Sequence, residues 1–199
     1  MKRKKGLIAV IAVIVMLVFA FIGYNIYRYP AMPKNLTDER RTLIVYFSWS
    51  TSGNTEKMAA YIQEQTGGDL LELEPLNPYP TDYEECGDVA LAERDENARP
   101  EIANLPDSIS EYDTVFVGYP IWWHTAPMII GTFLENYDLS GTNVYPFAQS
   151  ASMDTEQFEN SMEFVRESAA GANVHDGLFT ESSDTEGILD YLTENGFVE

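Results

Sequence analysis

A short run of small polar residues is the first candidate for chemistry in this sequence. It consists of Ser48, Ser50, Thr51, Ser52, Gly53, Asn54 and Thr55, and no basic residue lies among them. The preceding TLIVYF is typical of a buried strand, and the following TEKMAAYIQEQTGG is typical of a helix that ends at glycine. Hydroxyls and unpaired N–H groups at a helix start favour a bound anion. The run therefore predicts a site for one phosphate held by hydrogen bonds, and a polar turn that only caps the helix is the alternative.

Two nucleotide-binding motifs are excluded at this position. A P-loop needs Gly-Lys followed by Ser or Thr, whereas Gly53 is followed by Asn54. A dinucleotide fingerprint needs three glycines in the spacing G-x-G-x-x-G, and this run holds a single glycine. The run therefore offers no cradle for a triphosphate or a dinucleotide.

The second candidate is an aromatic loop that contains Pro120, Ile121, Trp122, Trp123 and His124. Two adjacent tryptophans present large flat apolar surfaces, and aromatic rings stack well on a planar ligand. Core packing or a protein contact is the alternative for either indole taken alone. His124 can hydrogen-bond a ring heteroatom of a ligand or cap the next helix, and the capping role is the simpler one.

The order of the elements decides whether these two loops meet. The patterns predict strands over 43–48, 69–75, 112–120, 141–148 and 172–179, and helices over 55–65, 85–98, 127–137, 153–169 and 183–197. Strands that alternate with helices predict one α/β domain, doubly wound in three layers around a five-stranded parallel sheet. The commonest order of such a sheet, 2-1-3-4-5, puts strands 1, 3 and 4 side by side.

That order brings a third loop to the same edge of the sheet. Ala148, Gln149 and Ser150 lie at the end of the fourth predicted strand. Ligands of open parallel sheets bind outside the carboxyl ends of the strands, so all three loops are expected to converge on one ligand. A phosphate site beside an aromatic platform suits a mononucleotide whose ring is planar and redox-active.

The residues around these loops resemble the flavodoxin family. The resemblance covers about Thr42 to Glu199 and is carried by LIVYFSWSTSGNT, LELEPLNPYPTDY, ENARPEI and above all VGYPIWWHTAPMIIGTFLENYDLSG. It implies non-covalent FMN, with the residues from Ser50 to Thr55 around its phosphate and those from Pro120 to Trp123 along the isoalloxazine ring. One departure is the third loop, where relatives carry glycines and this chain reads AQSAS.

The first 41 residues differ from the rest of the chain. Four basic residues among the first five precede an uncharged run of 17 residues, Leu7 to Gly23, which reaches about 25 Å as a helix. This is just short of a hydrocarbon core of about 27–30 Å. Residues 1–23 are predicted to be a single transmembrane signal-anchor with a cytoplasmic N-terminus, and residues 24–41 a linker. Cleavage after Ala20, which would release the protein, is the alternative.

The predicted domain, 42–199, is strongly acidic. Two of the 32 acidic residues, Asp38 and Glu39, precede it, so 30 remain against four basic ones, for a net charge of −26. Such a domain repels nucleic acid. Cys86 is the only cysteine, so no internal disulfide forms, and its acidic surroundings are expected to raise its pKa. Cys86 and His175 are assigned structural roles.

Three functions remain open from the sequence. The first is an extracytoplasmic protein, tethered to the cell membrane, that binds FMN and transfers electrons to a partner protein or to membrane quinones. The second is an FMN-dependent reductase that takes hydride from NAD(P)H for a quinone or another small molecule, although no dinucleotide motif supports it. The third is a binding module that has lost its flavin.

Overall fold

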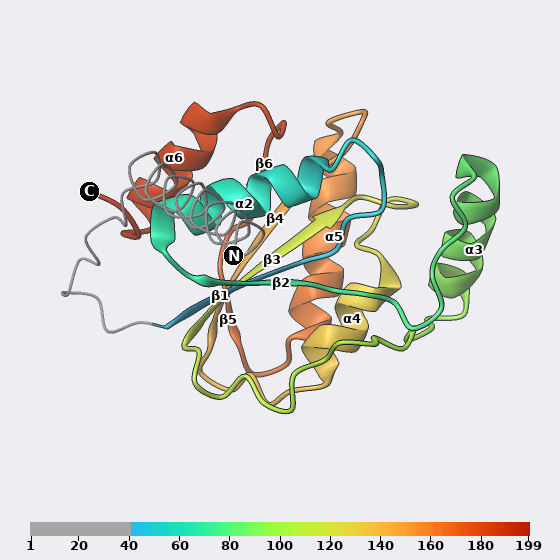
Figure 1. Ribbon diagram of the computed structural model, residues 1–199, viewed down its shortest axis with the longest axis horizontal. Helices are drawn as coiled ribbons and strands as arrows, with labels where there is room; N and C mark the ends of the chain where they lie inside the picture. Colours follow the sequence, from blue (N-terminus) through green and yellow to red (C-terminus); the bar gives the residue numbers. More distant parts are fainter. Residues whose placement is uncertain (1–40) are drawn as a thin grey trace, which may run out of the picture. The chain divides into compact units, whose positions relative to one another are not determined.

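The central sheet is built around three strands whose side chains are almost all buried. In the computed structural model, which describes residues 41–199, β1 (Thr42–Tyr46), β3 (Thr114–Pro120) and β4 (Asn143–Gln149) lie side by side and parallel (Figure 1). β2 (Asp69–Glu72) lies outside β1, and two short strands, β5 (Asn173–Val174) and β6 (Leu178–Phe179), both pair with β4. The order β2-β1-β3-β4-β5 confirms the predicted topology.

The last predicted strand, 172–179, needs a correction because it is divided into β5 and β6. The carbonyls of Val144 and Ala148 both accept hydrogen bonds on this edge of β4, so alternate residues of β4 face it. Pro146 lies between them and has no N–H to donate. The missing donor explains why the pairing with β4 is interrupted at residues 175–177 and begins again at β6.

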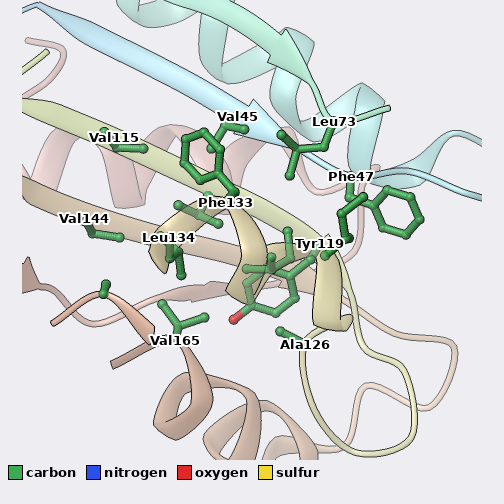
Figure 2. Packing of buried hydrophobic residues seen from close by; sticks show 14 of the residues in the cluster. Val45, Phe47, Leu73, Val115, Tyr119, Ala126, Phe133, Leu134, Val144 and Val165 are labelled. Atoms are coloured by element: carbon green, nitrogen blue, oxygen red, sulfur yellow. The ribbon is translucent and has the colours of Figure 1, made fainter. Parts of the chain in front are cut away.

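Helices cover both faces of the sheet. α4 (Met128–Glu135) and α5 (Thr155–Ser168) contribute to one core cluster together with β-strand side chains such as Val45 and Val117. Figure 2 shows Phe133 and Leu134 of α4 among Val45, Val115 and Val144 of the sheet. α2 (Asn54–Thr66) and α6 (Thr185–Glu194) share the other cluster with residues such as Ile44 and Phe116, which gives the predicted three layers.

α3 (Tyr83–Asp95) belongs to neither layer. Its buried residues, Cys86 and Ala90, are members of neither core cluster. In Figure 1 this helix stands at the right edge of the view, past the carboxyl ends of the strands. The crossover from β2 to β3 therefore places a helix beside the edge of the sheet from which the candidate loops emerge.

The helix starts fall into two kinds. Asp82, Asp154 and Asp184 begin α3, α5 and α6, and each carboxylate accepts a hydrogen bond from a backbone N–H of the first turn. α2 starts differently, at Gly53, with no side-chain cap.

The predicted membrane segment lies outside the part of the chain that the structure describes. Within residues 41–199, no helix combines the length and the apolar character needed to span a bilayer. The transmembrane helix predicted within 1–23 and nearly all of the predicted linker, 24–41, fall before this range.

Candidate functional site

Three loops leave the carboxyl edge of the sheet next to one another. We call them the hydroxyl loop (48–55, which runs into α2), the tryptophan hairpin (121–126) and the third loop (149–153). They meet because β1, β3 and β4 are adjacent and parallel. The hairpin and the third loop are also joined directly, since the N–H of Ile121 donates to the carbonyl of Gln149 at 3.2 Å.

The start of α2 leaves backbone donors unpaired. Gly53 has φ 58°, a left-handed conformation that glycine adopts at little cost. Its N–H donates to the backbone carbonyl of Ser50 at 2.9 Å. The N–H of Lys57 then makes the first bond of the helix, to the carbonyl of Gly53. Within the described residues, the N–H groups of Asn54, Thr55 and Glu56 have no acceptor. Three aligned donors with the helix dipole behind them fit an anion.

The side chains of the hydroxyl loop add further donors. Ser50 and Ser52 face each other, with 2.6 Å between their hydroxyl oxygens, and Thr51 is exposed beside them. Asn54 instead accepts a hydrogen bond from Ser182 of the segment before α6, and Thr55 is buried in the first turn. The first three residues are therefore well placed to reach a ligand, while Asn54 also joins the loop to the C-terminal segment.

One acidic side chain competes for this site. A Cβ atom placed on Gly53 would lie 2.8 Å from Oε2 of Glu56, so the Glu56 carboxylate folds back over the start of α2. There it lies in the same dipole field that favours a phosphate. A bound phosphate and this carboxylate would repel each other, so Glu56 must weaken binding or turn away.

The tryptophan hairpin has an unusual backbone. Trp122 and Thr125 exchange two backbone hydrogen bonds, of 2.9 and 3.0 Å, and enclose Trp123 and His124. These two central residues have φ of 47° and 66°, the signature of a type I′ turn, which normally contains Asn or Gly. The left-handed region costs a side-chain-bearing residue about 1–2 kcal/mol. Strain of this size in a non-glycine turn is typical of functional loops.

The two indoles of the hairpin have different surroundings. Trp122 lies edge-on to three other rings, Phe47, Trp49 and Tyr79, at centroid distances of 5.3, 6.1 and 5.2 Å. Trp123 is 42% exposed, and His124 beside it is also exposed. The first indole therefore anchors the hairpin, and the second is the more available for contact with a planar ring.

α3 holds the strained turn in place. The Trp123 Nε1–H donates to the carbonyl of Gly87 at 2.7 Å. The Arg94 guanidinium donates to the Trp123 carbonyl at 3.1 Å and lies over its ring at 5.9 Å from the centroid. A helix that covers neither face of the sheet thus makes three contacts with one residue of the hairpin.

A hydrogen-bonded pair connects α3 to the aromatic cluster. The Tyr79 hydroxyl donates to Oε2 of Glu93 at 2.8 Å. Burial raises the pKa of Glu93, and the Tyr79 hydroxyl opposes this by stabilising the carboxylate. Burial and the nearby Glu93 charge raise the pKa of the Cys86 thiol to about 11, which confirms the direction predicted from the sequence. Burial and a raised pKa are consistent with the structural role predicted for Cys86.

The third loop offers fewer groups for contact with a ligand than the hydroxyl loop and the tryptophan hairpin do. Ala148 is fully buried in β4, so a cofactor contact from its side chain has no support in this geometry. Gln149 ends the strand, and the Ser150 hydroxyl accepts the N–H of Met153 at 3.0 Å. Met153 has φ 48°, so this turn reaches a left-handed conformation without the glycines of the family. Pro120, Gln149 and Ser150 remain predicted contacts at this edge.

A cleft of about 500 Å³ adjoins the hydroxyl loop. One wall is the loop itself, including Trp49, and the other is the segment from Glu72 to Thr81, which includes Tyr79. Neither the hairpin nor the third loop lines it. The cleft thus lies on the β2 side of the hydroxyl loop, and the other two loops lie on the β3 and β4 side.

Four residues of this region were missed as site residues from the sequence: Trp49, Tyr79, Glu93 and Arg94. Trp49 lies inside the hydroxyl loop, but its side chain is aromatic, whereas the polar residues around it were selected as hydrogen-bond donors. Arg94 could have been singled out from the sequence, because it is one of only four basic residues after Thr42. An isolated cation in so acidic a domain needs a partner. Tyr79 and Glu93 are linked by a contact 14 residues apart that no local pattern reveals.

The described residues are similar to known proteins over most of their length. The model of the family described as Flavodoxin matches residues 41–195. A candidate flavoprotein from Bacteroides eggerthii DSM 20697 is 32% identical over 77% of this chain and 96% of its own, with a TM-score of 0.68. Another from Bacteroides uniformis ATCC 8492 is 29% identical over 78% and 99%, with a TM-score of 0.69.

A third solved structure contains a cofactor. It is a flavoprotein from Lactobacillus acidophilus NCFM in complex with FMN, 29% identical over 74% of this chain and 97% of its own, with a TM-score of 0.61. No curated protein is significantly similar to this chain.

The raised pKa of Glu93 predicts a pH-dependent effect of its replacement. A carboxyl group whose pKa is raised by folding stabilises the fold while protonated, and that contribution is lost as the pH rises through the folded pKa. Glu93→Gln keeps an acceptor for Tyr79 and removes the charge. We expect it to raise the free energy of unfolding at about pH 7 and to give little gain near pH 4, measured by urea unfolding.

Glu135→Gln is the matched control with the opposite sign. Hydrogen bonds from Arg99 lower the pKa of Glu135, so its charge stabilises the fold at neutral pH and that benefit fades in acid. This variant should be destabilised at about pH 7. If the two variants respond to pH in the same way, the assigned environment of Glu93 is incorrect.

Proposed function

Because this chain belongs to the flavodoxin family, we propose that it is a membrane-tethered electron carrier with its redox domain outside the cytoplasm. FMN is its cofactor, as the family and the FMN complex of the Lactobacillus acidophilus flavoprotein indicate. When bound, FMN supplies the redox chemistry, and the protein supplies binding, orientation and electrostatics.

One observation carries the assignment of the phosphate position. The first turn of α2 presents the unpaired N–H groups of Asn54, Thr55 and Glu56. In α3, α5 and α6 an aspartate accepts at least one such N–H group, and α4, which also lacks a side-chain cap, is not next to the hydroxyl loop. The hydroxyls of Ser50, Thr51 and Ser52 lie beside these donors, and no basic residue is present between Phe47 and Thr55. Such a set fits one terminal phosphate held by hydrogen bonds.

The acidity of the domain favours a low reduction potential. A net charge of −26 over residues 42–199 opposes the addition of electrons to a bound ligand, although solvent screens the effect. Arg94, which contacts the hairpin, is paired with Asp95 at 2.6 Å, so it offsets little of this field. The residues near the loops therefore favour a reducing carrier.

The alternative, an NAD(P)H-dependent reductase, has no specific observation in its favour. Among the described residues, Arg41, Arg94, Arg99 and Arg166 each have a carboxylate partner within 4.0 Å, and no basic cluster is left for a nicotinamide phosphate. Stopped-flow mixing of the FMN-loaded protein with NADH or NADPH separates the two functions. Rapid bleaching of the flavin would favour the reductase.

Membrane tethering rests on the sequence of residues 1–23. It would keep the domain close to the bilayer, where quinones or membrane redox proteins are within reach. We expect the full chain to stay with membranes after an alkaline carbonate wash and a chain starting at Thr42 to be released. A full chain that washes off, or a mature protein shortened by about 20 residues in mass spectrometry, would show that the leader is not a stable anchor.

FMN titration of the full chain in mild detergent tests the phosphate site. We expect flavin fluorescence to be quenched with micromolar or tighter affinity. Gly53→Val should abolish binding, because a branched side chain at φ 58° is strained and would stand beside the Glu56 carboxylate over the start of α2. Glu56→Gln should tighten binding severalfold, because it removes a negative charge from the start of α2.

Glu64→Gln is the control for that comparison, because it removes one charge from the same helix nearer its other end. It should leave the FMN affinity close to that of the parent chain. Full binding by Gly53→Val, or equal effects of the two glutamine variants, would contradict a phosphate at this helix start.

The two tryptophans of the hairpin should respond differently to alanine. Trp122→Ala removes a ring that contacts three others and should lower the free energy of unfolding by about 3 kcal/mol or more. Trp123→Ala should weaken FMN binding by about 1–3 kcal/mol, because its exposed ring is the one available for stacking. Urea unfolding and FMN titration of both variants measure this, and an unchanged FMN affinity in both would refute the aromatic platform.

A further inference from the structure

We propose that the cleft beside the hydroxyl loop is a second binding site, for a small organic cation such as a quaternary ammonium compound. The cleft has a volume of about 500 Å³, which lies in the usual range for small-molecule sites. The site is formed by residues that the described domain already holds in place. The proposal does not rest on FMN binding.

Aromatic rings that form part of the cleft are fixed by hydrogen bonds behind them. Trp49 donates its Nε1–H to the carbonyl of Pro80 at 2.8 Å, and Tyr79 donates its hydroxyl to Glu93. Tyr83 does not line the cleft, but it packs against Trp49 at a centroid distance of 6.4 Å and is 80% exposed. Ordered aromatic surfaces next to open solvent attract cations through the ring quadrupole, and quaternary ammonium groups gain most because they are weakly hydrated.

The charged side chains that line the cleft are negative, which is the sign that attracts a cation. Glu72 and Glu74 both line it, and no basic side chain does. Neither carboxylate has an ion-pair partner within the described part of the chain, where the arginines pair elsewhere. The Glu72 carboxylate also accepts a hydrogen bond from the Tyr46 hydroxyl at 3.3 Å, and burial, followed by the charges of Glu72 and Glu56, raises the pKa of Tyr46. An anion would therefore be repelled and a cation attracted.

The remaining choice is between a metal ion and an organic cation. No group of three or more His, Cys, Asp or Glu side chains that could hold a metal occurs in residues 41–199. Two carboxylates on a cleft with aromatic and proline walls instead suit a cation that also carries apolar surface. The chemistry thus favours an alkylated ammonium over Ca²⁺ or Mg²⁺, which need six or more oxygen ligands.

The cleft is separate from the predicted flavin position but shares a wall with it. Ser50 and Thr51 line the cleft and also belong to the proposed phosphate site. A cation on the β2 side of this loop and a phosphate dianion at the start of α2 would attract each other. Cation and FMN should therefore bind together, each at least as tightly in the presence of the other.

Choline and its neutral isostere 3,3-dimethylbutan-1-ol are the probes. They have nearly the same shape and differ in charge. In calorimetric titrations of the full chain at constant ionic strength, we expect choline to bind saturably with one site per chain and the isostere to bind at least tenfold more weakly. Glu72→Gln and Glu74→Gln should each reduce the choline affinity about three- to tenfold. Glu159→Gln, an exposed change on α5, is the matched control and should have no effect.

Three results would overturn the proposal: no saturable choline binding, equal affinity for the neutral isostere, or displacement of choline by FMN, which would assign the cleft to the cofactor. Because the glutamine variants change exposed side chains, they should remain folded, and unchanged choline affinity in both would also count against the site. Gly53→Val separates the two functions, since it should lose FMN and keep choline.

Discussion

The parallel pairing of β1, β3 and β4 is the constraint on which the candidate site depends. Tyr46 of β1 pairs with Gly118 of β3, and Gly118 in turn pairs with Phe147 of β4, so the three strands end close together. Gly118 makes this register possible, because a Cβ atom there would overlap the Phe147 ring. An alanine at this position would push two central strands apart or force a large buried ring to move. This close contact between the strands therefore sets the distances between the hydroxyl loop, the tryptophan hairpin and the third loop.

A second constraint acts on the tryptophan hairpin, where two residues with side chains occupy left-handed conformations. The expected cost of about 1–2 kcal/mol per residue must be offset by contacts elsewhere. α3 provides them through Gly87 and Arg94, and the ring cluster around Trp122 provides the rest. The position of α3 beyond the strands thus has a purpose that a helix on the face of the sheet could not serve. Its hydrogen bonds hold a turn whose sequence alone does not favour that shape.

The elements of the fold follow from local patterns far better than the site does. β1 and β3 are continuous apolar runs, and Asp154 is a typical helix start, so periodicity and capping predict them. The division of the last strand depends on Pro146 of the neighbouring strand, which only the pairing reveals.

The candidate site, too, could be predicted only as far as local sequence patterns reach. The polar run and the tryptophan pair stand out in composition, and the predicted strand order brings them together. Their supports, Tyr79 and Glu93 among them, come from the crossover between β2 and β3, and they reach the hairpin through contacts remote in sequence. The burial of Ala148 also required the structure, because Ala148 lies within both the predicted strand and β4, and only the packing shows that its side chain is covered.

The charge distribution explains why the proposed phosphate site contains no lysine or arginine. A domain with 30 acidic residues and four basic ones pairs its arginines with carboxylates, as Arg99 does with Glu135. Backbone N–H groups cannot be recruited in this way, since those of the first turn of a helix have no partner within it. They also add no net charge, so the field around the site stays negative up to the edge of the phosphate. A phosphate site made of amides and hydroxyls would therefore bind an anion through local dipoles and leave the net charge of the domain unchanged, which suits the reducing carrier proposed above.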